Sequence, residues 1–81
     1  MEQRVKEIIE TAWQGASALT ERLPGGRVSG SVIWEGFDGR DDVERQQMLR
    51  KLLADNLGQD IFDVGILLTY TPAEIEVMRA A

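Results

Sequence analysis

The chain has 81 residues, 43% of them apolar and 28% charged, which fits one folded globular domain rather than a disordered segment. It has no cysteine and no histidine, which excludes a disulfide framework and the thiolate and imidazole ligands of most metal sites. The formal net charge of −5 disfavours nucleic acid as a partner, because affinity for phosphates rests largely on Lys and Arg.

The N-terminal stretch MEQRVKEIIE is charged throughout, which is unlike a secretory signal peptide. No apolar run approaches the roughly 18 residues that a membrane span needs. We therefore expect a soluble cytoplasmic protein with one domain over residues 1–81 and no membrane partner. Because no nucleophile–base pairing is evident, we do not expect an enzyme.

Apolar residues at helical spacing predict a first helix from about Glu2 to Gln14, with Gly15 as its stop. The stripe consists of Val5, Ile8, Ile9, Ala12, Trp13 and Ala16. Two interpretations fit residues 17–23. Leu19 and Leu23 continue the helical phase, but a short strand from about Ser17 would give the next segment a partner, and we prefer the strand.

The residues Pro24-Gly25-Gly26 predict a turn. After it, residues 28–34 alternate in the manner of a strand, and Gly30 within them suggests a bulge or a close backbone approach. Trp34 and Trp13 are expected in the core or on a sheet face.

Residues 36–39 form a loop in this interpretation. They match the GxxG pattern of nucleic-acid-binding KH domains, but a tight turn with Phe37 in the core explains them better. A second helix is predicted from about Asp41 to Leu57, with Gly58 as a left-handed C-cap. Its apolar stripe comprises Val43, Met48, Leu49, Leu52, Leu53 and Leu57.

Residues 64–70 predict a third strand that is apolar on both sides, and we therefore expect it to be central in the sheet. Thr71-Pro72-Ala73-Glu74 is a capping box with Pro at the first helical position. A short C-terminal helix carrying Ile75 and Met78 should follow.

This order predicts an α+β fold in which two helices cover one face of a three-stranded mixed sheet. The other sheet face would stay open, so a homodimer through that face or through a sheet edge is one expected partnership.

The second half of the chain resembles the BolA family. The resemblance covers about Arg27 to Glu74 and rests on Phe37, Gly39, Arg45, Met48, Leu53, Ala54, Leu57 and the run Leu68-Thr69-Tyr70-Thr71. It implies a BolA-like, type II KH-like αββαβ fold with a short C-terminal helix.

The resemblance also implies two kinds of activity. One is partnership with a monothiol glutaredoxin, in which the BolA-like protein supplies a histidine to a shared [2Fe–2S] cluster. The other is regulation linked to stress response, morphology and transcription, with DNA binding by some members.

The family's cluster histidine corresponds to Asp63 here, and the histidine often found after the helix Arg corresponds to Gln46. The loop that carries a second ligand in some members is shortened to Pro24-Gly25-Gly26. Carboxylate oxygen is a poor match to the His and Cys ligands of such clusters, so we expect neither a bound cofactor nor a metal site.

Arg40, Arg45 and Arg50 are the candidate nucleic-acid-binding residues. On a helix they point in several directions and alternate with acidic residues, as in a solvated mixed-charge surface. Arg45 lies on the apolar side, where its stem would pack on the core edge and its head would meet a carboxylate or a carbonyl.

The sequence therefore favours a non-enzymatic BolA-like binding or regulatory protein that acts through protein contacts. The alternatives are a KH-like nucleic-acid-binding transcriptional regulator and a cluster carrier that uses Asp63.

Overall fold

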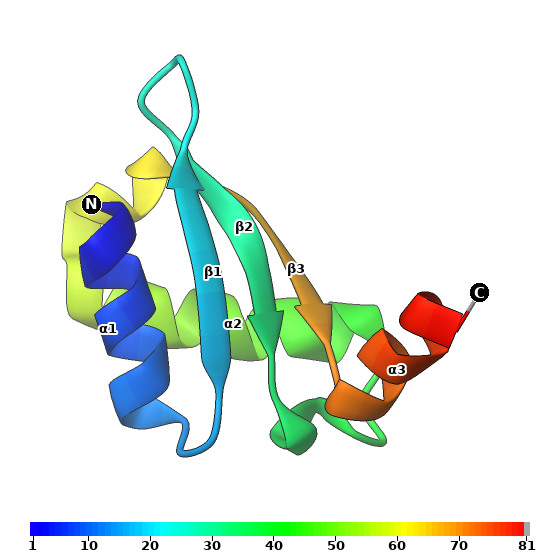
Figure 1. Cartoon of the computed structure of the whole chain (residues 1–81). Coiled ribbons are helices and arrows are strands. Elements are labelled where there is room, and N and C mark those ends of the chain that lie inside the picture. Colours follow the sequence, from blue (N-terminus) through cyan, green and yellow to red (C-terminus); the bar gives the residue numbers. More distant parts are fainter. Residues whose placement is uncertain (81) are drawn as a thin grey trace.

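The computed structural model describes residues 1–80 and places three strands in one mixed sheet (Figure 1). In chain order the elements are α1 (Glu2–Ala12), β1 (Ser17–Arg22), β2 (Val28–Ile33), the 3₁₀ turn η1 (Glu35–Phe37), α2 (Asp42–Leu57), the 3₁₀ turn η2 (Gly58–Asp63), β3 (Val64–Tyr70) and α3 (Pro72–Ala80). β2 is the central strand, antiparallel to β1 and parallel to β3. The predicted α+β class, the αββαβ order and the short C-terminal helix are confirmed.

The helix α1 ends at Ala12, two residues earlier than the apolar periodicity predicted. Trp13 has left helical geometry, with φ −112° and ψ 96°, although its N–H still donates to the carbonyl of Ile9. Its ring stacks on Trp34 with the centroids 4.6 Å apart and the planes 3° from parallel. The helix therefore stops where a contact with the distant end of β2 becomes available, which local periodicity does not encode.

Residues 17–22 form a strand, as preferred over the helical alternative. β1 pairs with β2 from Ser17↔Ile33 to Arg22↔Val28, and the N–H of Leu23 donates to the carbonyl of Arg27 across the predicted turn.

Gly30 confirms the predicted close approach inside β2. Its φ of +154° is rarely adopted by residues with side chains, and a Cβ at this position would lie 1.8 Å from the carbonyl oxygen of Leu19. The register between β2 and β3 shifts over the same segment, between Val28 and Gly30, which marks a bulge.

The helix α2 begins as predicted, because the Asp41 carboxylate accepts a hydrogen bond of 2.8 Å from the N–H of Glu44. The predicted stripe is wrong at Val43, whose side chain is 64% exposed. Arg45 takes the buried position in the first turns of the helix instead. Gly58 has a positive φ of 58°, but its ψ of −126° lies outside the left-handed helical region. The chain continues into η2, a 3₁₀ turn that was not predicted from the sequence.

β3 lies at the edge of the sheet, so the prediction that it is central is wrong. Its two apolar sides have different environments: Leu67 is buried, whereas Ile66 and Leu68 point away from the helices and are exposed. A strand that is apolar on both sides is expected to be buried on both faces, but the exposure of Ile66 and Leu68 shows that the second face of β3 is not covered.

The core lies between the helices α1 and α2 and one face of the sheet. Its buried apolar side chains are Val5, Ile9, Ala18, Val28, Val32, Phe37, Leu49, Leu53, Leu57 and Leu67. Phe37 is fully buried, as predicted, and its ring meets both Trp13 and Trp34 edge to face. The two Trp rings are half-buried around it, which confirms their predicted place at the core.

The predicted capping box is present at the start of α3. The N–H of Glu74 donates to Thr71 Oγ1 at 3.2 Å, and the N–H of Thr71 donates to Glu74 Oε1 at 2.9 Å. α3 then projects from one end of the sheet (Figure 1), and within it Met78 is exposed. Over residues 1–80, no helix combines the length and the apolar character needed to cross a membrane.

Candidate functional site

The sheet face that points away from α1 and α2 carries exposed apolar side chains. The strand register places Leu19, Ser31 and Leu68 in one row across the three strands. Leu19 and Leu68 are 60% and 50% exposed, and Ile66 is 73% exposed. We call this surface the open sheet face; its residues are Leu19, Glu21, Ser29, Ser31, Ile66, Leu68 and Tyr70.

The position that resembles the family's cluster ligand lies at the entrance to β3. Asp63 is the last residue of η2 and is exposed, and its neighbour Phe62 is 73% exposed. Within residues 1–80, no three His, Cys, Asp or Glu side chains lie close enough together to hold a metal ion. Asp63 offers only carboxylate oxygen, and the sequence has no imidazole or thiolate to accompany it. The residues present therefore do not fit a [2Fe–2S] cluster.

Arg45 is the most constrained charged residue of the protein. Its side chain is only 8% exposed, and its guanidinium forms two parallel bonds with the Glu74 carboxylate, Nη1 to Oε1 at 2.8 Å and Nη2 to Oε2 at 3.0 Å. Nε donates to the carbonyl of Arg40 at 2.9 Å, and the guanidinium carbon lies 5.7 Å from the centre of the Phe37 ring. This geometry matches the structural interpretation of Arg45, with its stem on the core and its head on a carboxylate and a carbonyl.

The ion pair changes the protonation of both partners. The bonds from Arg45, together with the N–H of Thr71, lower the pKa of Glu74 to about 2. The carboxylate in turn raises the pKa of Arg45 above its ordinary value. Both groups are charged at neutral pH, and the pair connects α2 to the N-terminus of α3.

The guanidinium groups of the three arginines proposed for nucleic acid do not form one exposed basic surface. Arg40 Nη1 lies 3.7 Å from Glu44 Oε2 just before the helix, and Arg45 faces inward. Arg50 lies one and a half turns further along α2, is exposed, and has no ion-pair partner within 4.0 Å among residues 1–80. A nucleic-acid role for these residues stays a prediction.

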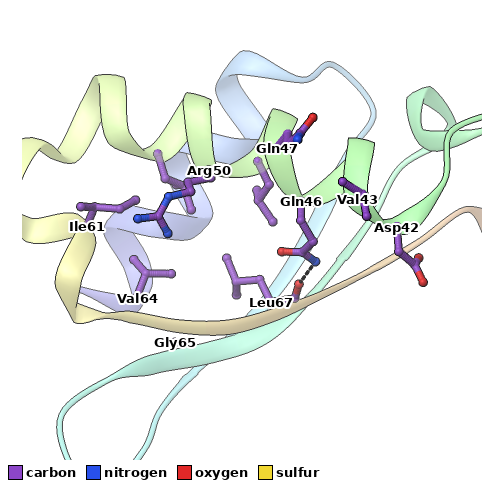
Figure 2. Close-up of a pocket in the computed structure, with 11 residues that line it drawn as sticks. Asp42, Val43, Gln46, Gln47, Arg50, Ile61, Val64, Gly65 and Leu67 are labelled. Carbon is purple, nitrogen blue, oxygen red and sulfur yellow. Dashed lines mark hydrogen bonds between the residues drawn. The ribbon is translucent and has the colours of Figure 1, made fainter.

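A groove between α2 and β3 was not predicted from the sequence. It has a volume of about 450 Å³ and is lined by Asp42, Val43, Gln46, Gln47, Leu49, Arg50, Leu53, Ile61, Val64, Gly65 and Leu67. Gln46 crosses it, donating from Nε2 to the carbonyl of Leu67 at 2.8 Å (Figure 2). We call this feature the α2–β3 groove. The i,i+4 spacing of Gln46 and Arg50 puts both on one helix side, but the strand that they face is decided by the tertiary fold.

The chain is similar to solved structures, but its sequence matches no family model. No curated protein matches it significantly either. A solved BolA protein homologue from Coxiella burnetii superposes with a TM-score of 0.76 at 26% identity, covering 94% of this chain and 96% of that one. BolA1 from Arabidopsis thaliana gives a TM-score of 0.74 at 18% identity, covering 90% of this chain and 93% of that one.

The chain has a BolA-like fold. A third similar structure, the BolA domain of SufE1 from Arabidopsis thaliana, has a TM-score of 0.74 at 21% identity and covers the same shares of the two chains. Agreement over at least nine-tenths of each chain extends the likeness beyond the segment from Arg27 to Glu74, to include α1 and β1. The chain has Asp63 and Gln46 at two positions where the resemblance implies histidine.

Proposed function

We propose that this BolA-like protein is a non-enzymatic binding or regulatory protein of the cytoplasm that acts through protein contacts. Its role would be that of an adaptor to a monothiol glutaredoxin and its iron–sulfur system, or a regulator in stress response or morphology. The observation that carries the proposal is the open sheet face, where Leu19, Ile66 and Leu68 are each at least half exposed.

The open sheet face has the composition of a protein contact surface. Leu19, Ile66 and Leu68 provide an apolar centre, and serines and Glu21 accompany them. An exposed apolar patch with polar residues around it is typical of an interaction site, because burying it releases ordered water at little desolvation cost. This explains why β3 keeps an apolar outer side although it is an edge strand.

Asp63 offers only carboxylate oxygen as a ligand, which supports a role in which this chain contacts a protein partner without ligating a cluster. A partner could still dock where Phe62 and β3 are exposed, since docking needs apolar area and not a histidine. The adaptor role therefore survives the loss of the ligand, whereas a role as a cluster carrier through Asp63 lacks suitable donors.

A pull-down with a monothiol glutaredoxin, done with the wild type and with Ile66→Lys, tests the proposal. A lysine in the centre of the interface should weaken the complex by at least tenfold, because its charge loses water on burial. Val77→Lys is the matched control, since Val77 is 71% exposed on α3 and outside the open sheet face.

Three results would count against this proposal: no complex with the wild type, equal loss in both variants, or equal retention in both. Sedimentation of the protein alone gives the remaining outcome. A dimer that Ile66→Lys dissociates and Val77→Lys leaves intact would make a second copy of the chain the occupant of the open sheet face.

The alternative function, a KH-like nucleic-acid-binding regulator, would depend on Arg40 and Arg50, because the donors of Arg45 are already engaged by Glu74 and the Arg40 carbonyl. It requires binding of DNA or RNA at about 50 mM salt that weakens steeply as salt is raised and is reduced by Arg50→Ala.

A further inference from the structure

We propose that the α2–β3 groove binds a compact amphipathic monocarboxylate, with its carboxylate at Arg50 and its apolar body between α2 and β3. The inference does not depend on any protein partner. It rests on the bounded apolar part of the groove and on the unpaired cation at its mouth.

The apolar part of the groove is bounded on two sides. At one end η2 joins α2 directly to β3, so the chain itself forms the wall, and Ile61 points in from it. At the other end the side chain of Gln46 bridges from α2 to the carbonyl of Leu67 (Figure 2). A ligand that fits between these two ends is short, because Gln46 and Gly58 are about three helical turns apart.

The same contacts disfavour an extended peptide along β3. The N–H of Trp34 donates to the carbonyl of Tyr70, so Tyr70 directs its polar backbone atoms toward β2. Since these groups alternate along a strand, Thr69 and Leu67 direct theirs toward the free edge. Both of these carbonyls are already bonded from α2, by Arg45 Nη1 at 3.4 Å and by Gln46 Nε2 at 2.8 Å. An added strand would compete with these bonds for the two carbonyl oxygens, whereas a small molecule in the groove would not.

The walls between the two ends suit an apolar body. Ile61 and Val64 are half-buried and form the accessible apolar walls. Leu49, Leu53 and Leu67 are almost fully buried and form the floor. Pockets of a few hundred Å³ with apolar walls and a few polar groups are the common form of small-molecule sites, and the volume of about 450 Å³ falls in that range.

Arg50 provides the charge that selects an acid. Its side chain extends from α2 toward Ile61 and Val64 (Figure 2) and has no carboxylate partner among residues 1–80. The adjacent Lys51 differs, because it lies 3.3 Å from Asp55 in an i,i+4 pair. An unpaired guanidinium beside apolar walls offers a fork of donors to a carboxylate.

Asp42 limits the ligand to one acidic group. It precedes Gln46 by about one helical turn and lines the groove beyond the Gln46 bridge. A second carboxylate at the far end of a longer ligand would approach this residue and be repelled. The charge pattern therefore favours a single acidic head near η2 and an apolar remainder.

Titration of the ¹⁵N-labelled wild-type protein with octanoate tests the proposal. We expect saturable shifts of the Ile61, Val64 and Leu67 amide signals with a Kd on the order of 1 mM or tighter. Acetate has the head without the tail, and 1-octanol and octylammonium have the tail without the anion. These three probes should each bind at least about tenfold more weakly.

Arg50→Gln should weaken octanoate binding by about tenfold, because it removes the cation and keeps a polar side chain. Lys51→Gln is the matched control, with the same charge change at the next position outside the groove, and should change the Kd by less than about twofold.

The proposal is overturned if octanoate gives no saturable shift, or if 1-octanol binds as well as octanoate. It is equally overturned if the shifts map to Ile66 and Leu68 on the open sheet face, or if Arg50→Gln and Lys51→Gln behave alike. The probe series on the wild type needs no variant to fold, and Arg50 is exposed, so each measurement gives an answer.

Discussion

At the scale of single residues, the Arg45–Glu74 ion pair has a structural role. Arg45 is held by the Glu74 carboxylate, the Arg40 carbonyl and the Phe37 ring, so three separate segments depend on one guanidinium. The apolar periodicity of the helix located Arg45 on the inner side. The identity of its acid could not be read from the sequence, because Glu74 is 29 residues away in the chain.

The pair makes stability depend on pH in a defined direction. The pKa of Glu74 is lowered from its usual 4.5 to about 2 in the folded state, so its contribution is present above pH 4.5 and is lost as pH falls through 2. We expect Glu74→Gln to lower the urea midpoint at neutral pH, with the difference from wild type shrinking between pH 4.5 and 2. Glu76→Gln makes the same charge change at an exposed position on α3 and is the control.

Gly30 is a second residue that the fold requires, because a Cβ has no room at this position. Gly30→Ala should destabilise the protein by well over 1 kcal/mol, because the added Cβ meets the Leu19 carbonyl and the φ of +154° becomes strained. Gly25→Ala is its control, since nothing lies within 4 Å of a Cβ there. Equal urea midpoints for the two variants would contradict this account of the bulge.

At the scale of elements, the helix α2 was predicted well because its signals are local. Asp41 caps it, and Leu49, Leu53 and Leu57 recur on its buried side. β3 was predicted as a strand, but its edge position was not, since the sheet order depends on which strand pairs with β2. The early end of α1 at Ala12 has a similar cause, because the partner of Trp13 is Trp34, 21 residues further along the chain.

The cap of α2 gives a quantitative test. Asp41→Ala should cost about 1 kcal/mol of unfolding free energy, because the N–H of Glu44 loses its acceptor. Asp42→Ala removes the same charge one residue later, where the attractions to the helix dipole and to Arg45 are lost but no backbone hydrogen bond is, and should cost less than Asp41→Ala. Denaturant unfolding of both variants measures the difference.

At the scale of the whole molecule, the sheet has one face in the core and one face in solvent. Leu53→Ala, on the core side, should cost about 2–5 kcal/mol, a large share of the stability expected for a chain of this size. Leu68→Ala, on the open sheet face, should cost less than about 1 kcal/mol, because half of that side chain is already exposed. Unfolding curves that rank the two variants in the opposite order would contradict the placement of the core on the helix-covered face of the sheet.

The sequence by itself determined the order of the main helices and strands, the N-terminal caps of α2 and α3, and the absence of nitrogen and sulfur ligands at the entrance to β3, because these depend on residue types and short-range spacing. The resemblance carried by the second half of the chain gave the BolA-like fold that the structural comparisons show. Only the tertiary structure decided that β3 is an edge strand, that Arg45 pairs with Glu74, and that Arg50 lies without an ion-pair partner beside the α2–β3 groove. Each of these depends on which distant segments meet, and a periodic pattern specifies that a face is apolar without specifying what covers it.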